Sequence, residues 1–216
     1  MRVLEKIRLQ LKGMGLMALV PVAGCLLLLP FGTWLLNRDI TDAETRYLMA
    51  SEVSYQFMPL FSVFWIYLFH HEYVEGEGRE VLLLGRGVSG YTFFYYVLLL
   101  PFFWCGICLM PVADMYRTGF FLEMAVCSFF LCGLAYFLNF SLGKISLSFL
   151  CVLLYIFLCN VDIRNTLALN DEEGMKVPSY FYTVLKESGG TTFPALCYLA
   201  VGIVFWLVGW YRSKQI

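Results

Sequence analysis

The sequence predicts an all-α polytopic membrane protein with six transmembrane helices. Of its 216 residues, 60% are hydrophobic and 14% are charged, and the mean hydropathy is +0.73. Soluble domains are about half apolar and about a quarter charged. The apolar residues form long continuous runs, which favours helices over the alternating pattern of a β-barrel. The composition excludes a soluble enzyme domain and a disordered chain, and the balance of 15 basic and 16 acidic residues excludes a nucleic-acid-binding module.

Six apolar runs are long enough to be interpreted as membrane spans, since a helix needs about 20 such residues to cross the hydrocarbon core. The runs cover residues 14–36, 53–69, 91–113, 119–140, 142–161 and 193–211. The chain, residues 1–216, is therefore expected to be a single transmembrane domain. Asn139 and Asn160 lie near the ends of two runs, where they are expected to cap helices or form hydrogen bonds between them.

The first 13 residues alternate apolar and basic side chains at helical spacing. This pattern predicts an amphipathic helix in the headgroup layer, with its cations held by anionic lipid. The cations are Arg2, Lys6, Arg8 and Lys12. The alternative is a basic flank that only sets topology. Cys25 ends a segment similar to a lipoprotein cleavage box, but the apolar run continues to Leu36, which favours a retained span.

The distribution of basic residues predicts that both termini are cytoplasmic. With that orientation, nine of the 15 Lys and Arg residues lie in inner segments and six in outer segments. This agrees with the excess of Lys and Arg in cytoplasmic loops of membrane proteins.

The longest predicted cytoplasmic loop covers residues 70–90. Its first half is acidic, residues 81–84 are apolar but too short to span, and glycines follow at 85, 87 and 90. Glu75 and Arg79 could form an i,i+4 ion pair if the segment is helical. A short helix with an acidic start and an apolar patch suits docking into a groove on a protein.

Two metal or redox interpretations receive little support from the residues. His70, His71, Glu72 and Glu75 do not form HExxH, and adjacent histidines point to different faces of a helix. Cys105 and Cys108 form a CxxC inside an apolar run with no second CxxC, which favours packing over a metal or redox role. No metal site is therefore expected. The chain also lacks GxxxxGK[ST], so it has no Walker motif for ATP.

The run Glu75-Gly76-Glu77-Gly78-Arg79-Glu80-Val81-Leu82-Leu83-Leu84, followed by Gly87-Val88-Ser89, resembles the coupling-helix segment of ABC-2 type transporter permeases. Those proteins have a basic amphipathic N-terminal helix, six spans and cytoplasmic termini. Their first cytoplasmic loop carries a Glu/Gly/Leu-Leu pattern that is often followed by Pro-(Ile/Val)-Ser. Here Gly87 stands at the position of that proline.

The resemblance implies a membrane subunit of an ABC exporter that hydrolyses no ATP itself. ATP and Mg would be bound by a partner ATPase subunit, and this chain would bind no cofactor. A second permease copy or a paralogue would complete the pathway, in what is expected to be a bacterial cytoplasmic membrane. The substrate class is expected to be amphiphilic or peptide-like. The residues assigned to the ATPase contact are Glu75, Glu77, Gly78, Arg79, Glu80, Leu83 and Leu84.

The resemblance also implies a structured external segment between spans five and six, residues 162–192. Pro178 and the pair Gly189-Gly190 are the start and stop signals of a short helix there. The alternative is an ordinary polar loop.

Glu123 is the clearest ionisable residue inside a predicted span, and such residues are costly and commonly functional. It could line a pathway, pair with Arg117, or simply lie at the interface. Two other classes of protein remain open. A six-span scaffold or channel would lack an ATPase, although no filter or charge ring is visible. An intramembrane hydrolase would need a serine with a nearby base, which the sequence does not offer.

Overall fold

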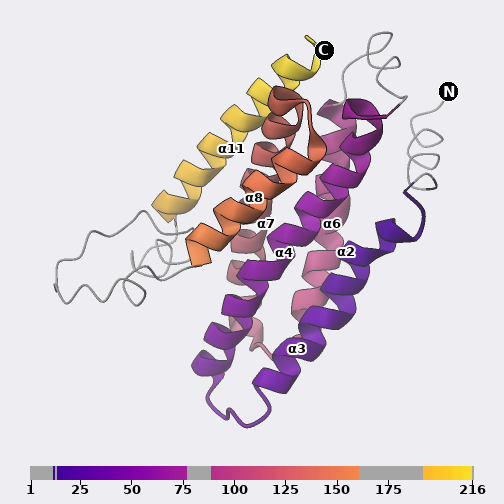
Figure 1. Ribbon diagram of the computed structural model, residues 1–216. Helices are drawn as coiled ribbons and strands as arrows, with labels where there is room; N and C mark the ends of the chain where they lie inside the picture. Colours follow the sequence, from indigo (N-terminus) through magenta and orange to yellow (C-terminus); the bar gives the residue numbers. More distant parts are fainter. Residues whose placement is uncertain (1–11, 13, 77–88, 161–191, 216) are drawn as a thin grey trace, which may run out of the picture.

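A computed structural model describes residues 12, 14–76, 89–160 and 192–215, and those residues contain helices and turns but no strand. The elements in chain order are η1 (Gly15–Ala18), α2 (Leu19–Ala23), η2 (Gly24–Leu28), α3 (Leu29–Leu36), α4 (Ala43–Val74), α6 (Ser89–Leu109), α7 (Asp114–Leu142), α8 (Ile145–Asn160) and α11 (Thr192–Ser213). Figure 1 shows these helices as neighbouring rods of one elongated bundle. The predicted all-helical class is confirmed for the described residues.

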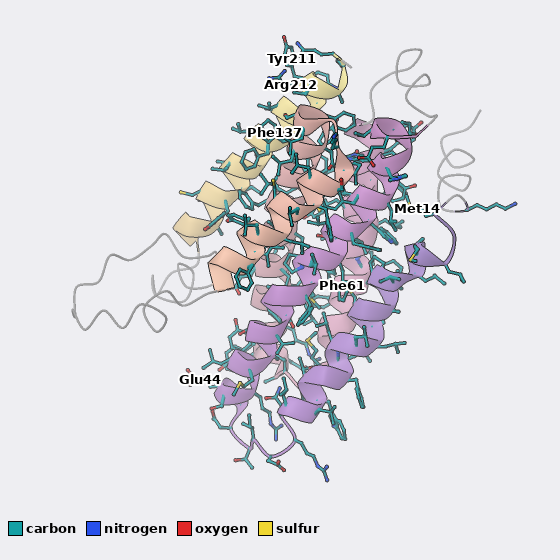
Figure 2. The ribbon with its side chains drawn as sticks, viewed as in Figure 1. Met14, Glu44, Phe61, Phe137, Tyr211 and Arg212 are labelled. Carbon is teal, nitrogen blue, oxygen red and sulfur yellow. The ribbon has the colours of Figure 1, made fainter. Side chains whose placement is uncertain are left out.

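Successive rods run in opposite directions, so the turns of the chain gather at two ends of the bundle (Figure 1). The C-terminal ends of α4 and α11 and the α7–α8 turn lie at the end drawn uppermost, here called the upper end. The turns between α3 and α4 and between α6 and α7 lie at the lower end. Figure 2 shows the same polarity, with Arg212 at the upper end and Glu44 at the lower end.

Within the described residues, four helical segments are long and apolar enough to cross a membrane: Gly15–Leu36, Tyr91–Leu109, Asp114–Leu142 and Ala195–Ser213. Their outward faces carry large apolar side chains that are more than half exposed, including Leu27, Leu122, Leu196 and Leu207. An apolar surface over an apolar core is typical of a protein whose solvent is lipid. The apolar helical segments in the second and fifth predicted spans are shorter, at Phe57–His71 and Ile145–Phe157.

The first predicted span is not one continuous α-helix. It contains a 3₁₀ turn, a short α-helix, a π-helical segment and a second α-helix. In the π segment the Leu29 N–H donates to the Gly24 carbonyl, five residues back. Pro30 explains the wide turn, because a proline ring clashes with the carbonyl four residues before it in a regular α-helix.

Helix α4 begins ten residues before the predicted second span. Asp42 is its N-cap, and its carboxylate accepts a hydrogen bond from the Thr45 N–H at 2.8 Å. A 32-residue helix is about 48 Å long, more than the hydrocarbon thickness of a bilayer. The predicted span is therefore the apolar part of a longer helix.

Sharp turns connect α7 to α6 before it and to α8 after it. Helix α6 ends at Leu109 because Pro111 disfavours helical geometry at the residue before it, and Ala113 is the extended N-cap of α7. Helix α7 ends at Gly143, whose φ of +64° is the left-handed C-cap conformation that glycine adopts without strain. The α7–α8 connection is therefore a tight hairpin, with Ile145 as the first residue of α8.

Helix α7 is the centre of the bundle and contacts α4, α6, α8 and α11. Its contact with α11 is close because glycines lie where the two backbones meet. A Cβ at Gly133 would lie 3.0 Å from the Gly202 carbonyl oxygen, and a Cβ at Gly209 would lie 3.1 Å from the Phe137 nitrogen. Small residues allow this approach between membrane helices, where packing drives association.

Candidate functional site

The segment that sequence reasoning assigned to an ATPase contact begins at the last turn of α4. Of its residues, the structure describes Glu75, while Glu77, Gly78, Arg79, Glu80, Leu83 and Leu84 lie outside the described residues. Helix α4 continues to Val74 and α6 begins at Ser89, so both borders of the predicted loop 70–90 are helical. The site can therefore be built from the ends of the helices that flank this connection.

Glu75 joins the end of α4 to the start of α8. Its Oε1 accepts a hydrogen bond from the Ile145 N–H at 2.8 Å, and its side chain is one third exposed. The His71 Nε2 lies 3.8 Å from the other carboxylate oxygen. A carboxylate at a helix N-terminus satisfies a backbone donor and interacts favourably with the helix dipole. Glu75 thus caps a helix that lies 70 residues away in the sequence.

His70 is fully buried and links three helices. Its Nε2 lies 2.9 Å from Thr92 Oγ1 on α6, and the Asn139 Nδ2 on α7 donates to its Nδ1 at 2.8 Å. Because Nδ1 accepts from Asn139, Nε2 carries the ring proton and donates to Thr92. The ring also contacts Tyr136 and Phe140, with centroids 5.2 and 5.0 Å away. The interhelical hydrogen bond expected of Asn139 is confirmed.

Tyr67 supplies a third polar contact from the same part of α4. Its hydroxyl lies 3.1 Å from Ser148 Oγ on α8. Tyr67 and His70 lie three residues apart in α4, and Glu75 is the C-cap of the same helix. We call these three residues the α4 anchor. Together they connect the last two turns of α4 to α6, α7 and α8.

Helix α11 is fastened to the same end of α7 by a separate contact. The Tyr136 hydroxyl lies 3.0 Å from Ser213 Oγ, and the Ser213 hydroxyl also donates to the Trp210 carbonyl at 2.8 Å. Tyr136 also packs on the His70 ring and on the Trp206 ring, so aromatic contacts join α4, α7 and α11. Trp206 adds a hydrogen bond to the Phe129 carbonyl at 3.1 Å.

The other residues predicted from the sequence lie away from the α4 anchor. Glu123 is half-buried within α7, and Arg117 forms an ion pair with Asp114 at the lower end. Of the four cations assigned to the membrane surface, Lys12 is described and exposed, while Arg2, Lys6 and Arg8 lie outside the described residues. The external segment is outside them as well, apart from Thr192 at the start of α11.

Cys105 and Cys108 are free thiols on α6, the first exposed and the second half-buried. Across the described ranges, no group of three or more His, Cys, Asp or Glu side chains is arranged to hold a metal ion. His70 and His71 point to different faces, as expected of neighbours on a helix, with His70 buried and His71 exposed.

Sequence reasoning missed the role of His70 because it treated this histidine as part of a loop. The available signal was its position directly after the apolar run 53–69, since a polar residue at the end of a span commonly finds a partner on another helix. The partner of Glu75 had no local signal, because Ile145 contributes a backbone N–H that any residue except proline would offer.

No family of known proteins, no curated protein and no solved structure matches this chain.

Proposed function

We propose that this chain is the membrane-spanning permease subunit of an ATP-driven ABC transporter. The proposal is supported mainly by the position of the α4 anchor. It lies at the end of α4, where the connection to α6 begins, and the sequence of that connection resembles a coupling helix. His70 and Glu75 connect the end of α4 to α6, α7 and α8. A force applied to the end of α4 therefore acts on the bundle and not on one helix end. A coupling segment needs such a connection to its helices.

The proposal includes six spans, with α4 and α8 as the second and fifth. Helix α4 is long enough to cross a bilayer although its apolar part, Phe57–His71, is short. An even number of passes brings the N-terminal segment, the connection after α4, the α7–α8 hairpin and the C-terminus to one side of the membrane. The distribution of Lys and Arg favours the cytoplasmic side for them. The chain would lie in a bacterial cytoplasmic membrane with its basic N-terminal helix on the lipid.

In this proposal the partner ATPase subunit binds ATP and Mg, and this chain is not itself an enzyme. ATP binding would close the ATPase dimer and move the coupling segments of two permease chains, which shifts the spans between two arrangements. The two chains would be identical copies or paralogues. The exported substrate would be amphiphilic or peptide-like, in keeping with the many aromatic and aliphatic residues of the chain.

The test is affinity purification of the tagged full-length chain in mild detergent, followed by identification of co-eluting proteins. We expect an ATPase with a Walker motif and a second permease chain. The double variant Glu80→Lys with Leu83→Asp should insert normally but lose the ATPase. Glu44→Lys is the matched control, because it reverses an exposed carboxylate at the lower end of the bundle.

Two results would contradict the proposal. Normal recovery of the ATPase with the double variant would remove the assigned contact. Absence of any ATPase from the wild-type preparation would favour a scaffold or channel without a motor.

A further inference from the structure

The two helix ends that flank the connection after α4 are fastened to each other and to the α7–α8 hairpin. His70 near the end of α4 contacts Thr92 near the start of α6, at 2.9 Å between Nε2 and Oγ1. The same ring receives the Asn139 amide from the last turns of α7. Each ring nitrogen of His70 therefore contacts a different helix.

Glu75 extends this linkage across the hairpin turn. Asn139 and Ile145 stand on either side of Gly143, and the Gly143 N–H donates to the Asn139 carbonyl at 3.2 Å. His70 binds the side of the hairpin that precedes the turn, and Glu75 binds the side that follows it. The hairpin is thus held at two points by a single turn and a half of α4.

The first span is attached in a different way. It packs closely on the neighbouring helices, with Gly24 against the Phe61 ring and the Cys25 backbone against Gly106. Trp65 on α4 also donates its Nε1–H to the Ala18 carbonyl at 2.7 Å. The contacts of His70 and Glu75 are instead with α6, α7 and α8.

We propose that His70 and Glu75 are positioning residues that make the end of α4, the start of α6 and the α7–α8 hairpin one mechanical unit. Whatever displaces the end of α4 moves these four helix ends together. This inference goes beyond the proposed function and holds whether or not an ATPase is the partner.

Hydrogen–deuterium exchange of the purified full-length chain in lipid nanodiscs tests the unit, because exchange reports local opening segment by segment. Glu75→Ala should speed exchange about tenfold in the first turn of α8, and also in the last turns of α4 and α7, since one lost hydrogen bond opens the linked segments. Glu75→Gln should change these rates little, because its amide oxygen still accepts from Ile145.

Asp42→Ala is the matched control, since it removes a carboxylate cap of the same kind at the far end of α4. It should speed exchange only in the first turn of α4. If Glu75→Ala changes only the first turn of α8, Glu75 is a local cap and the proposal is overturned.

A second measurement covers the case in which Glu75→Ala loosens the whole fold. Glu75→Leu keeps much of the side-chain volume but cannot accept from Ile145, and Asn139→Leu removes the donor to His70, so independent contacts would give additive effects on the free energy of opening. Within one unit, the double variant should depart from the product of the two single effects on exchange by more than about threefold. A product that holds within twofold contradicts the proposal.

Discussion

Asn139 Nδ2 lies 2.8 Å from His70 Nδ1, and this buried contact joins α7 to α4 at the upper end of the bundle. The same asparagine accepts the Gly143 N–H through its backbone carbonyl. Asn139 therefore accepts the C-cap hydrogen bond of α7 and also binds α4. The contact lies among aromatic rings, where water is not available to replace a lost partner.

We predict that His70→Ala lowers the free energy of unfolding by roughly 2–4 kcal/mol, because it opens a cavity and removes the hydrogen bonds of this ring with Thr92 and Asn139. Chemical unfolding in detergent micelles measures this. His71→Ala is the control, since the neighbouring histidine is exposed and should cost less than about 0.5 kcal/mol. Equal losses for the two variants would contradict the buried role of His70.

The contact between α6 and the first span gives a second prediction. A Cβ at Gly106 would lie 2.5 Å from the Cys25 carbonyl oxygen, so Gly106→Ala should destabilise the protein by about 1–3 kcal/mol through overpacking. Gly119→Ala should be neutral or slightly stabilising, because nothing lies near its Cβ position and alanine favours helix. Thermal unfolding of both variants in one detergent provides the comparison. A Gly106→Ala protein as stable as the wild type would rule out the close approach.

The Tyr136–Ser213 hydrogen bond gives a third prediction. A double-mutant cycle with Tyr136→Phe and Ser213→Ala should return a coupling energy of about 0.6 kcal/mol, a typical value for hydrogen bonds between membrane helices. Both substitutions keep most of the side-chain volume, so the cycle isolates the hydrogen bond. A coupling energy of zero would show that α11 is held by packing alone.

Asp42 gives a prediction about pH outside the membrane-spanning segments. The Thr45 hydroxyl and N–H donate to its carboxylate, which holds the pKa of Asp42 below its usual value of 3.8. A lowered pKa means that the charged form stabilises the folded state. That contribution is present above about pH 4 and is lost as pH falls through the folded pKa.

The measurement for Asp42 is an NMR titration of the Thr45 amide in micelles. We expect a midpoint below 3.8 for the wild type and no transition of this kind for Asp42→Asn. A midpoint above 3.8 would mean that the cap does not hold the charged carboxylate.

The sequence predicts the approximate location of each helical segment because continuous apolar runs are a strong and local signal. The ends are predicted less well. The ten residues after Asp42 contain several polar side chains and form nearly three turns of α4, so a search for continuous apolar runs does not detect helix there. The ends of α6 and α7 depend on the backbone conformations near Pro111 and at Gly143, which the apolar composition of a run does not reveal.

The candidate site was predictable only in part. Glu75 was selected from its place in a motif, and the structure gives it a partner in α8 that no local pattern indicates. His70 was treated as a loop residue because its burial depends on the packing of α6 and α7. Contacts between segments distant in sequence depend on tertiary structure, so a single sequence locates residues of interest without pairing them.

The π-helical turn at Gly24–Leu28 determines which side chains of α3, the next helix, face the rest of the bundle. A π turn holds one residue more than an α turn, and each residue of a regular helix advances the azimuth by about 100°. Helix α3, which follows this turn and buries Thr33, therefore presents different residues to α4 and α6 than a regular α-helix of the same sequence would. If these residues formed regular α-helical turns instead, the half that carries Phe31 and Trp34 would rotate by about 100°, and Thr33 would turn away from its buried position.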